Sequence, residues 1–92
     1  MSAGRVARRI VVHGRVQGVF FRATVRDAAQ AAGAAGWAHN RDDGTVEVWV
    51  EGEPDAVDAV VAACRTGSPA SRVDQVDVEE AEPGRLSGFD SR

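Results

Sequence analysis

The stretch that decides the fold of this 92-residue chain is Gly14-Arg15-Val16-Gln17-Gly18-Val19-Phe20-Phe21-Arg22. It follows an apolar run and opens into a segment with helical spacing of apolar residues, so it joins a predicted strand to a predicted helix. Two glycines allow positive φ angles, which let successive main-chain N–H groups point at one place beside the positive end of the helix. Arg22 adds a permanent cation whose planar guanidinium can form two parallel hydrogen bonds with a phosphoryl group. These are the parts of a phosphate-binding loop.

Two interpretations of this stretch stay open on spacing alone. Glycine-rich turns between a strand and a helix are common, and most of them only redirect the chain. The identity of the residues adds information, because seven of the nine positions match a known signature, namely Gly14, Val16, Gln17, Gly18, Val19, Phe21 and Arg22. The stretch closely resembles the phosphate-binding loop of acylphosphatases. A contiguous match of this length is far more specific than an isolated glycine motif, and it favours the functional interpretation.

Length and charge limit the classes of protein to which the chain can belong. We expect one small domain at residues 6–92 after a flexible N-terminus at residues 1–5. The net charge is −3, with 14 acidic residues against 11 arginines and no lysine, so nucleic acid and anionic membrane surfaces are not expected partners. No apolar run is long enough to span a membrane, and the N-terminus lacks the apolar core of a signal peptide. These features predict a cytoplasmic, monomeric protein.

The first half of the chain predicts a strand, a helix and a hairpin. An apolar strand at residues 6–13 leads into the glycine-containing stretch, and an amphipathic helix of roughly three turns begins near Phe21. Gly33 and Gly36 are the expected stop signal of this helix. An Asp-Gly pair at residues 43–44 then predicts a turn between two strands.

The second half adds another helix and one or two strands. The helix begins at residues 53–54, with proline early, and ends at Gly67. In the strand that follows, Val73 is off the parity of the later valines, which predicts a bulge or a late strand start, and only Leu86 and Phe89 are available for a last strand. The complete order predicts an α+β, ferredoxin-like βαββαβ sandwich, with an antiparallel four- to five-stranded sheet and two helices on one face.

The alternation of residues also predicts which side chains are buried. In the strand after the turn, Val46, Val48 and Val50 are expected on the core face. The opposite face is expected to be mostly solvent-exposed and carries Thr45, Glu47, Trp49 and Glu51. The lone Cys64 lies on an apolar helix stripe, so we expect it to be buried and unreactive, and its lack of a disulfide partner fits a reducing compartment. His13 closes the first strand without a visible carboxylate partner, and a role in the chemistry is not expected.

A second segment also resembles an acylphosphatase signature, through Gly36, Trp37, Ala38, Asn40, Gly44, Val46 and Gly52. His39 departs from the signature, because the family usually has a basic residue, a glutamine or a small residue there. Without the resemblance, Asn40 would be interpreted as a turn or strand-end residue that bonds its own main chain. The resemblance makes it the candidate that holds an attacking water.

The resemblance implies a role for each residue of the site. It implies that phosphate is bound by main-chain N–H groups at Arg15, Val16, Gln17, Gly18, Val19 and Phe20. Arg22 would bind the same phosphate and, with Asn40, would be catalytic. The implied reaction converts an acyl phosphate and water into a carboxylate and inorganic phosphate, without metal or cofactor.

The residues themselves argue against other phosphatase chemistries. A cysteine-based loop would carry its nucleophile six residues before the arginine, where this chain has Val16. His13, His39 and the acids at residues 42–43 do not form the ligand set expected of a metal centre. What remains is attack by water on an activated phosphoryl group, helped by positioning and charge stabilisation. A carboxylate leaves without needing a proton, so an acyl phosphate requires no general acid.

A non-catalytic binding module on the same scaffold is the alternative. An RNA-binding version would use the open face of the sheet, where Trp49 lies between Glu47 and Glu51. Those acids would repel a phosphate backbone. A version that senses an anion or binds a partner would have kept the loop and lost hydrolysis, and the presence of both Arg22 and Asn40 counts against it.

Overall fold

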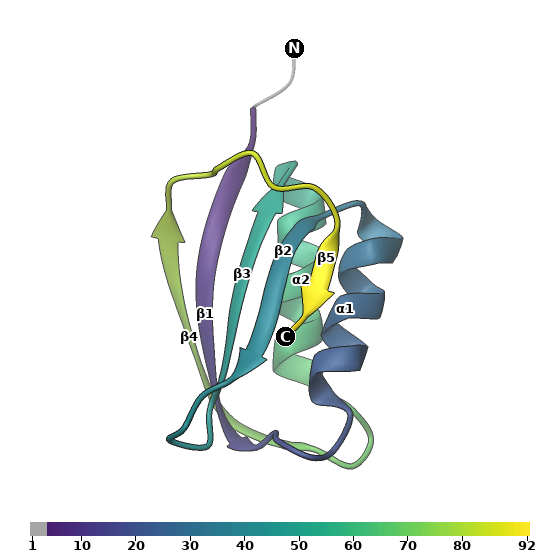
Figure 1. The fold of residues 1–92 in the computed structure, drawn as a ribbon, viewed down its shortest axis with the longest axis vertical. Coiled ribbons are helices and arrows are strands. Elements are labelled where there is room, and N and C mark those ends of the chain that lie inside the picture. The colour runs from purple at the N-terminus through teal and green to yellow at the C-terminus, as the bar shows by residue number, and fades with distance from the viewer. Residues whose placement is uncertain (1–3) are drawn as a thin grey trace.

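Strands and helices follow one another in the order expected for a βαββαβ sandwich (Figure 1). A computed structural model describes residues 4–92, with the elements β1 (Val6–Arg15), α1 (Phe21–Ala32), β2 (Ala35–Asn40), β3 (Val46–Gly52), α2 (Pro54–Thr66), β4 (Arg72–Ala81) and β5 (Phe89–Ser91). The strands form one five-stranded sheet in the order β4-β1-β3-β2-β5, and both helices cover one of its faces (Figure 1). The predicted α+β fold class is confirmed.

Helix α1 buries one apolar stripe and ends at a glycine. Phe21, Val25 and Ala29 recur at helical spacing and are fully buried. Gly33 ends the helix with a φ of 78°, and its N–H faces the last helical carbonyls. The prediction that Gly36 also ends this helix is wrong. Gly36 lies in β2, where an added Cβ atom would come within 1.8 Å of a carbonyl oxygen of β3, so glycine is needed for the close approach of these two strands.

The core lies between the sheet and the two helices. Val46, Val48 and Val50 are fully buried on the helix-covered face, as the alternation predicts. Cys64 is also fully buried, and its burial raises the pKa of the thiol to about 12, so the thiolate is not formed at neutral pH. The predicted burial of Cys64 is confirmed, and its lack of reactivity stays a prediction.

The C-terminal end of the chain forms a parallel edge strand. Residues 82–88, here called the C-terminal segment, run from the end of β4 across the end of the sheet to its opposite edge (Figure 1). Strand β5 then pairs with β2 in parallel, with Gly36 opposite Phe89. The sheet is therefore mixed and not wholly antiparallel. Of the two residues expected in a last strand, Phe89 lies in β5 and is buried in the core, whereas Leu86 precedes the strand and is 40% exposed.

The prediction of a mostly exposed second face is wrong at Glu51 and Thr45. Glu51 is fully buried, because the C-terminal segment covers it and donates main-chain N–H groups from Gly84 at 3.1 Å and Leu86 at 3.4 Å. Arg5 also donates to this carboxylate, at 2.9 Å. Thr45 is only 7% exposed. Residues 1–3 of the predicted flexible N-terminus lie outside the described residues.

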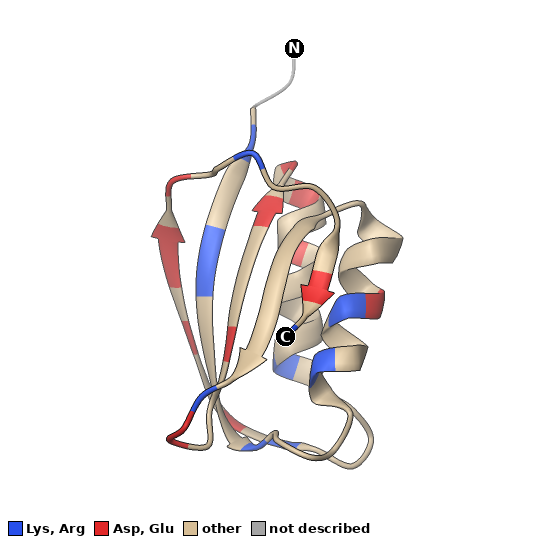
Figure 2. Cartoon of the chain, in the orientation of Figure 1, with Lys and Arg blue, Asp and Glu red and all other residues tan. Residues whose placement is uncertain are grey.

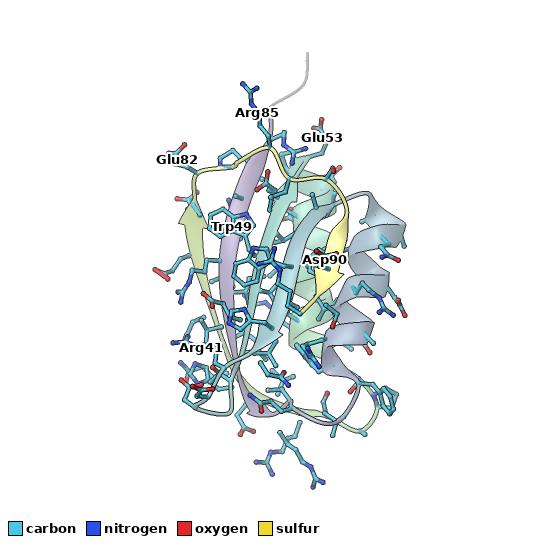
Figure 3. The ribbon with its side chains drawn as sticks, in the orientation of Figure 1. Arg41, Trp49, Glu53, Glu82, Arg85 and Asp90 are labelled. Atoms are coloured by element: carbon cyan, nitrogen blue, oxygen red, sulfur yellow. The ribbon has the colours of Figure 1, made fainter. Side chains whose placement is uncertain are left out.

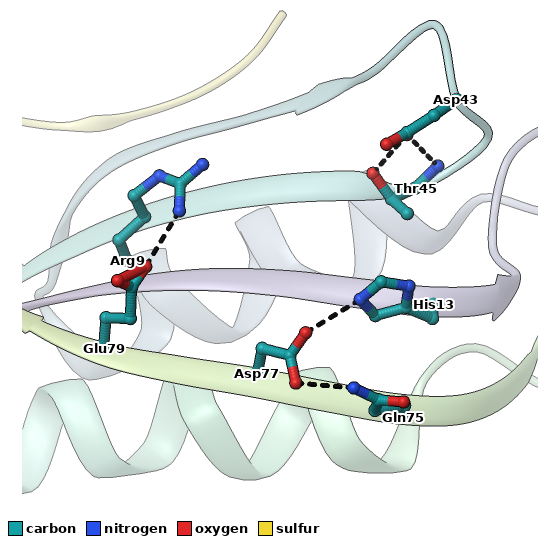
Figure 4. Close-up of polar contacts among 7 residues, drawn as sticks. All are labelled: Arg9, His13, Asp43, Thr45, Gln75, Asp77 and Glu79. Atoms are coloured by element: carbon teal, nitrogen blue, oxygen red, sulfur yellow. Dashed lines mark hydrogen bonds and ion pairs between the residues drawn. The ribbon is translucent and has the colours of Figure 1, made fainter.

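Strands β1 and β4 pair with one irregularity. His13 faces Gln75 and the next residue of β1, Gly14, faces Val73, so β4 carries one extra residue at this point. This is the bulge predicted from the parity of the valines. The expectation that His13 has no carboxylate partner is wrong, because its Nε2 lies 2.9 Å from Oδ2 of Asp77 across the strand pair (Figure 4).

Charges of both signs alternate across the uncovered face of the sheet (Figure 2). Arg9 of β1 pairs with Glu47 of β3 at 2.5 Å. It also pairs with Glu79 of β4 at 3.0 Å, as Figure 4 shows. The indole N–H of Trp49 donates to Glu51 at 2.8 Å, and Trp49 lies on this same face (Figure 3). Arg9 on this face is thus paired with acids of both neighbouring strands. Within residues 4–92, no helix has the length and apolar character needed to cross a membrane.

Candidate active site

The loop between β1 and α1 has the backbone shape of an anion site. This phosphate loop, residues 15–20, passes through positive φ angles at Gly18, 73°, and at Phe20, 61°. Val16 and Val19 turn their side chains into the core and are 1% and 8% exposed. Since these two anchors hold the loop against the core, its main-chain N–H groups are held in a fixed arrangement beside the N-terminus of α1.

The first turn of α1 keeps its positive end free of acids. No acidic side chain lies in this turn, and the carbonyl of Phe20 accepts both the N–H and the hydroxyl of Thr24 at 3.1 Å. The partial positive charge of the helix N-terminus is therefore not neutralised from within the turn. Arg22, the second residue of the helix, adds a full positive charge next to the loop.

Two side chains hold the phosphate loop from opposite sides. The amide of Gln17 donates to the carbonyls of Arg41 at 2.8 Å and Thr45 at 2.9 Å, which ties the loop to the turn between β2 and β3. The hydroxyl of Ser68, which is buried after α2, donates to the carbonyl of Val19 at 2.6 Å. The phosphate loop, the turn between β2 and β3 and the connection between α2 and β4 all lie at one end of the molecule (Figure 1). The side chain of Gln17 is thus used for support, and Ser68 is a supporting residue that sequence reasoning missed.

A pocket of about 270 Å³ opens next to the loop. Its walls bring together four predicted site residues, Val16, Gly18, Phe20 and Arg22, with the neighbouring Phe21 and Ala23 and with Ser91 from β5. The guanidinium of Arg22 donates to the main-chain oxygen of Arg92, so β5 and the residue after it orient this cation. The sequence could not predict that Ser91 and Arg92 lie at this site, since nothing in a three-residue strand indicates which edge of the sheet it joins.

Three predicted phosphate-binding residues do not line this pocket. Arg15 is the last residue of β1 and is exposed. It lies opposite Arg72 in the β1–β4 strand pair. Gln17 and Val19 direct their side chains elsewhere, as described above, so only their main-chain N–H groups remain available to a ligand. The predicted contribution of these three residues was through the main chain, and it stays a prediction.

Asn40 lies at the same end of the molecule but in a separate depression. It is the exposed last residue of β2, and it lines this depression with His39, Arg41, Asp42 and Asp43. Its neighbour Arg41, visible at this end in Figure 3, is the residue that Gln17 contacts. Through Gln17, the loop that lines the pocket beside Arg22 is thus hydrogen-bonded to Arg41, which lines the depression beside Asn40.

The other polar residues near Asn40 have structural partners. His39 stacks on Trp37 with 5.1 Å between ring centroids, and its Nε2 lies 3.4 Å from Glu47. The hydroxyl of Thr45 donates to Asp43 at 2.6 Å and holds the pKa of that carboxyl below its usual range (Figure 4). Within residues 4–92, no three potential ligands among His, Cys, Asp and Glu gather as a metal site.

This fold and site define a class of protein: a small α+β domain with a phosphate loop at a strand–helix junction. The family model described as Acylphosphatase matches residues 8–91. An acylphosphatase of Haloquadratum walsbyi is 47% identical over 100% of this chain and 99% of its own length. One of Anaeromyxobacter dehalogenans is 52% identical, with 98% of each chain covered. The crystal structure of acylphosphatase from Bacillus subtilis superimposes with a TM-score of 0.89 at 41% identity, covering 95% of this chain and 98% of that one.

The chain belongs to the acylphosphatase family. It is therefore an enzyme that hydrolyses acyl phosphates, as the resemblance of its two motifs predicts. The non-catalytic alternative is not supported, since full-length relatives of the whole chain are acylphosphatases.

Proposed function

We propose that this chain hydrolyses acyl phosphates by direct attack of water on phosphorus, without a covalent intermediate or a metal ion. The observation that carries the proposal is the pocket in which the positive-φ residues Gly18 and Phe20 meet the guanidinium of Arg22. Main-chain N–H groups and one guanidinium complement the equatorial phosphoryl oxygens, where charge is concentrated during transfer.

The phosphate loop and Arg22 bind the phosphoryl group in this mechanism. Main-chain N–H groups of residues 15–20 donate to its oxygens, and Arg22 adds a charge-assisted pair of hydrogen bonds. The contact from Arg22 to the Arg92 main-chain oxygen supports this role, because it holds the guanidinium in the pocket wall before substrate arrives. A preorganised donor loses little conformational freedom when the transition state forms.

Asn40 orients the attacking water. The new bond joins the water oxygen to phosphorus, while the bond from phosphorus to the carboxylate oxygen breaks and its electron pair leaves with the carboxylate. A phosphoryl oxygen of the substrate takes a proton of the water, so inorganic phosphate is the second product. No acid is needed for the leaving group, because a carboxylate is stable at neutral pH.

The experiment compares Arg22→Ala and Asn40→Ala with the native chain, using benzoyl phosphate in the presence of EDTA. Arg22→Ala should weaken inhibition by inorganic phosphate and lower turnover together, since it removes hydrogen bonds worth roughly 2–4 kcal/mol. Asn40→Ala should retain phosphate inhibition and lose about a hundredfold or more in kcat. Asp42→Ala is the matched control. Asp42 lies two residues after Asn40 and lines the same depression, but it is exposed and has no role in the proposed mechanism.

Three results would contradict this proposal. Unchanged phosphate inhibition in Arg22→Ala would remove Arg22 from the phosphate site. Equal losses of phosphate binding and turnover in a folded Asn40→Ala variant would make Asn40 a phosphate ligand, and the water would then need another partner. Loss of native activity on addition of EDTA would exclude the metal-free mechanism.

A further inference from the structure

Phe20 occupies a position that stability alone does not explain. Its side chain is 82% exposed, the largest exposed fraction among the big apolar residues that the structure describes. Its φ of 61° and ψ of 21° lie in the left-handed region, which is unfavourable for a residue with a Cβ atom. It is also the one non-glycine residue with positive φ within residues 4–92. A glycine would relieve this strain at the cost of little buried surface, so folding alone does not explain the phenyl ring.

The ring lies where a substrate would leave the phosphate loop. Phe20 is the last residue of the loop and immediately precedes α1, and it lines the same pocket as Arg22. By chemistry, the side chains that line this pocket divide into polar ones, from Arg22 and Ser91, and apolar ones, from Val16, Phe20, Phe21 and Ala23. An anionic group and an apolar group that are joined in one molecule would match this division.

We infer that Phe20 selects acyl phosphates whose acyl group is aromatic or otherwise large and apolar. The inference rests on the proposed function, because it assumes that the phosphoryl group occupies the loop. With phosphorus held there, the acyl group points away from the loop amides and toward the pocket mouth, where the exposed ring offers an apolar face. Aromatic rings favour stacked or edge-to-face contacts with each other, and small acyl groups such as acetyl cannot make them.

The strained backbone of Phe20 is part of this arrangement. Its carbonyl is held by the N–H and the hydroxyl of Thr24, both at 3.1 Å, so the residue is fixed at the start of the helix. A ring on a fixed main chain loses little freedom when a ligand binds, which favours selectivity. Outliers of this kind collect at functional sites, where the surrounding structure maintains them.

The test measures a ratio in which general damage to the loop cancels. We would determine kcat/KM for benzoyl phosphate and for acetyl phosphate in the native chain and in Phe20→Ala, Phe20→Gly and Phe20→Tyr. The preference for benzoyl phosphate should fall by about fivefold to tenfold in Phe20→Ala and Phe20→Gly, the scale of a lost aromatic contact. It should be retained in Phe20→Tyr, which keeps the ring.

A second measurement does not depend on turnover. Two stable phosphonates replace the bridging oxygen by a methylene group, 2-oxo-2-phenylethylphosphonate and 2-oxopropylphosphonate, and their affinities are compared by calorimetry. The affinity ratio should fall with the kinetic ratio. Ratios that are unchanged in Phe20→Ala and Phe20→Gly would overturn the inference. If Arg22→Ala leaves the affinity of both phosphonates unchanged, the phosphate site itself is misassigned, and the inference falls with the proposed function.

Discussion

Ser68 supports the phosphate loop although it does not line the pocket. Its buried hydroxyl donates to the carbonyl of Val19 at 2.6 Å, and Ser71 in turn holds Ser68 through hydrogen bonds of 2.8 Å. A carbonyl bound on the core side directs the next main-chain groups of the loop toward the pocket. We therefore propose Ser68 as a positioning residue, which would affect phosphate binding through the loop.

We predict that Ser68→Ala weakens inhibition by inorganic phosphate about fivefold and lowers the free energy of unfolding by about 1–3 kcal/mol, because the carbonyl of Val19 is left without its buried donor. Phosphate inhibition and urea unfolding measure the two effects. Thr66→Ala is the matched control, since it removes a hydroxyl from the exposed last residue of α2, two positions before Ser68. Equal weakening of phosphate inhibition in both variants would reduce Ser68 to a general stabilising residue.

The contrast between Arg22 and Ser68 shows what a sequence can predict about single residues. Arg22 belongs to a contiguous motif whose glycines and arginine are residue types suited to anion binding. The motif therefore predicts that Arg22 lies at the pocket wall, where the structure has it. Ser68 lies 49 residues from Val19 along the chain, in a loop whose composition predicts only a turn. Contacts between distant loops depend on how the helices pack, and the chain order does not contain that information.

The C-terminal segment is the element that a single side chain holds in place. Trp49 and Arg5 donate to Glu51 at 2.8 and 2.9 Å, and the main-chain N–H groups of Gly84 and Leu86 donate to the same carboxylate. Glu82 and Arg85 mark this segment at the end of the sheet in Figure 3. The segment leads into β5, which carries Ser91 to the pocket and Arg92 to Arg22. The ion pair between Arg5 and Glu51 lies far from the phosphate loop. By holding the C-terminal segment, Glu51 nevertheless helps to keep Ser91 and Arg92 at the pocket.

We predict that Glu51→Gln lowers the free energy of unfolding by on the order of 2–4 kcal/mol and loosens β5, because an amide nitrogen would face donors that need an acceptor. Hydrogen exchange of the Gly36 and Arg92 amides, which bond to Gly88 and Ala38, should accelerate at least about tenfold. Glu47→Gln is the control, since Glu47 lies on the same strand and pairs with Arg9 but does not contact the segment. Unchanged exchange in Glu51→Gln would show that β5 is held by its strand pairing alone.

At the level of elements, the strands and helices up to β4 follow from local pattern, and the last strand does not. Period-two valines, the Asp-Gly turn and the glycine at the end of α1 each act through their own neighbourhood. Strand β5 has three residues, and only Phe89 is buried. Its parallel pairing depends on the path of residues 82–88 over Glu51, and an acid in an alternating strand is ordinarily interpreted as exposed.

For the whole molecule, the acidic groups decide how stability depends on pH. Burial alone would raise the pKa of Glu51, but the hydrogen bonds from Trp49, Arg5, Gly84 and Leu86 outweigh burial and leave that pKa below its usual value. The hydrogen bonds from Gln75 and His13 lower the pKa of Asp77, which is an exposed group. Glu51 is fully buried and Asp77 is not. Solvent and salt therefore weaken the contribution of Glu51 to stability less than that of Asp77.

We predict that the free energy of unfolding is level near neutral pH and falls as the pH drops below about 5. The sign follows from linkage: a carboxyl whose pKa is lower in the folded state binds its proton more readily when unfolded, so acid favours the unfolded chain. The stabilisation from Glu51 is present above the ordinary carboxyl pKa of about 4.3 and is lost as the pH falls toward its folded value. Urea unfolding of the native chain and of Glu51→Gln at several pH values between 7 and 3 measures this effect. The variant should be less stable at pH 7 and show the shallower fall, so the two curves converge in acid; parallel curves would mean that other carboxyls set the acid limit.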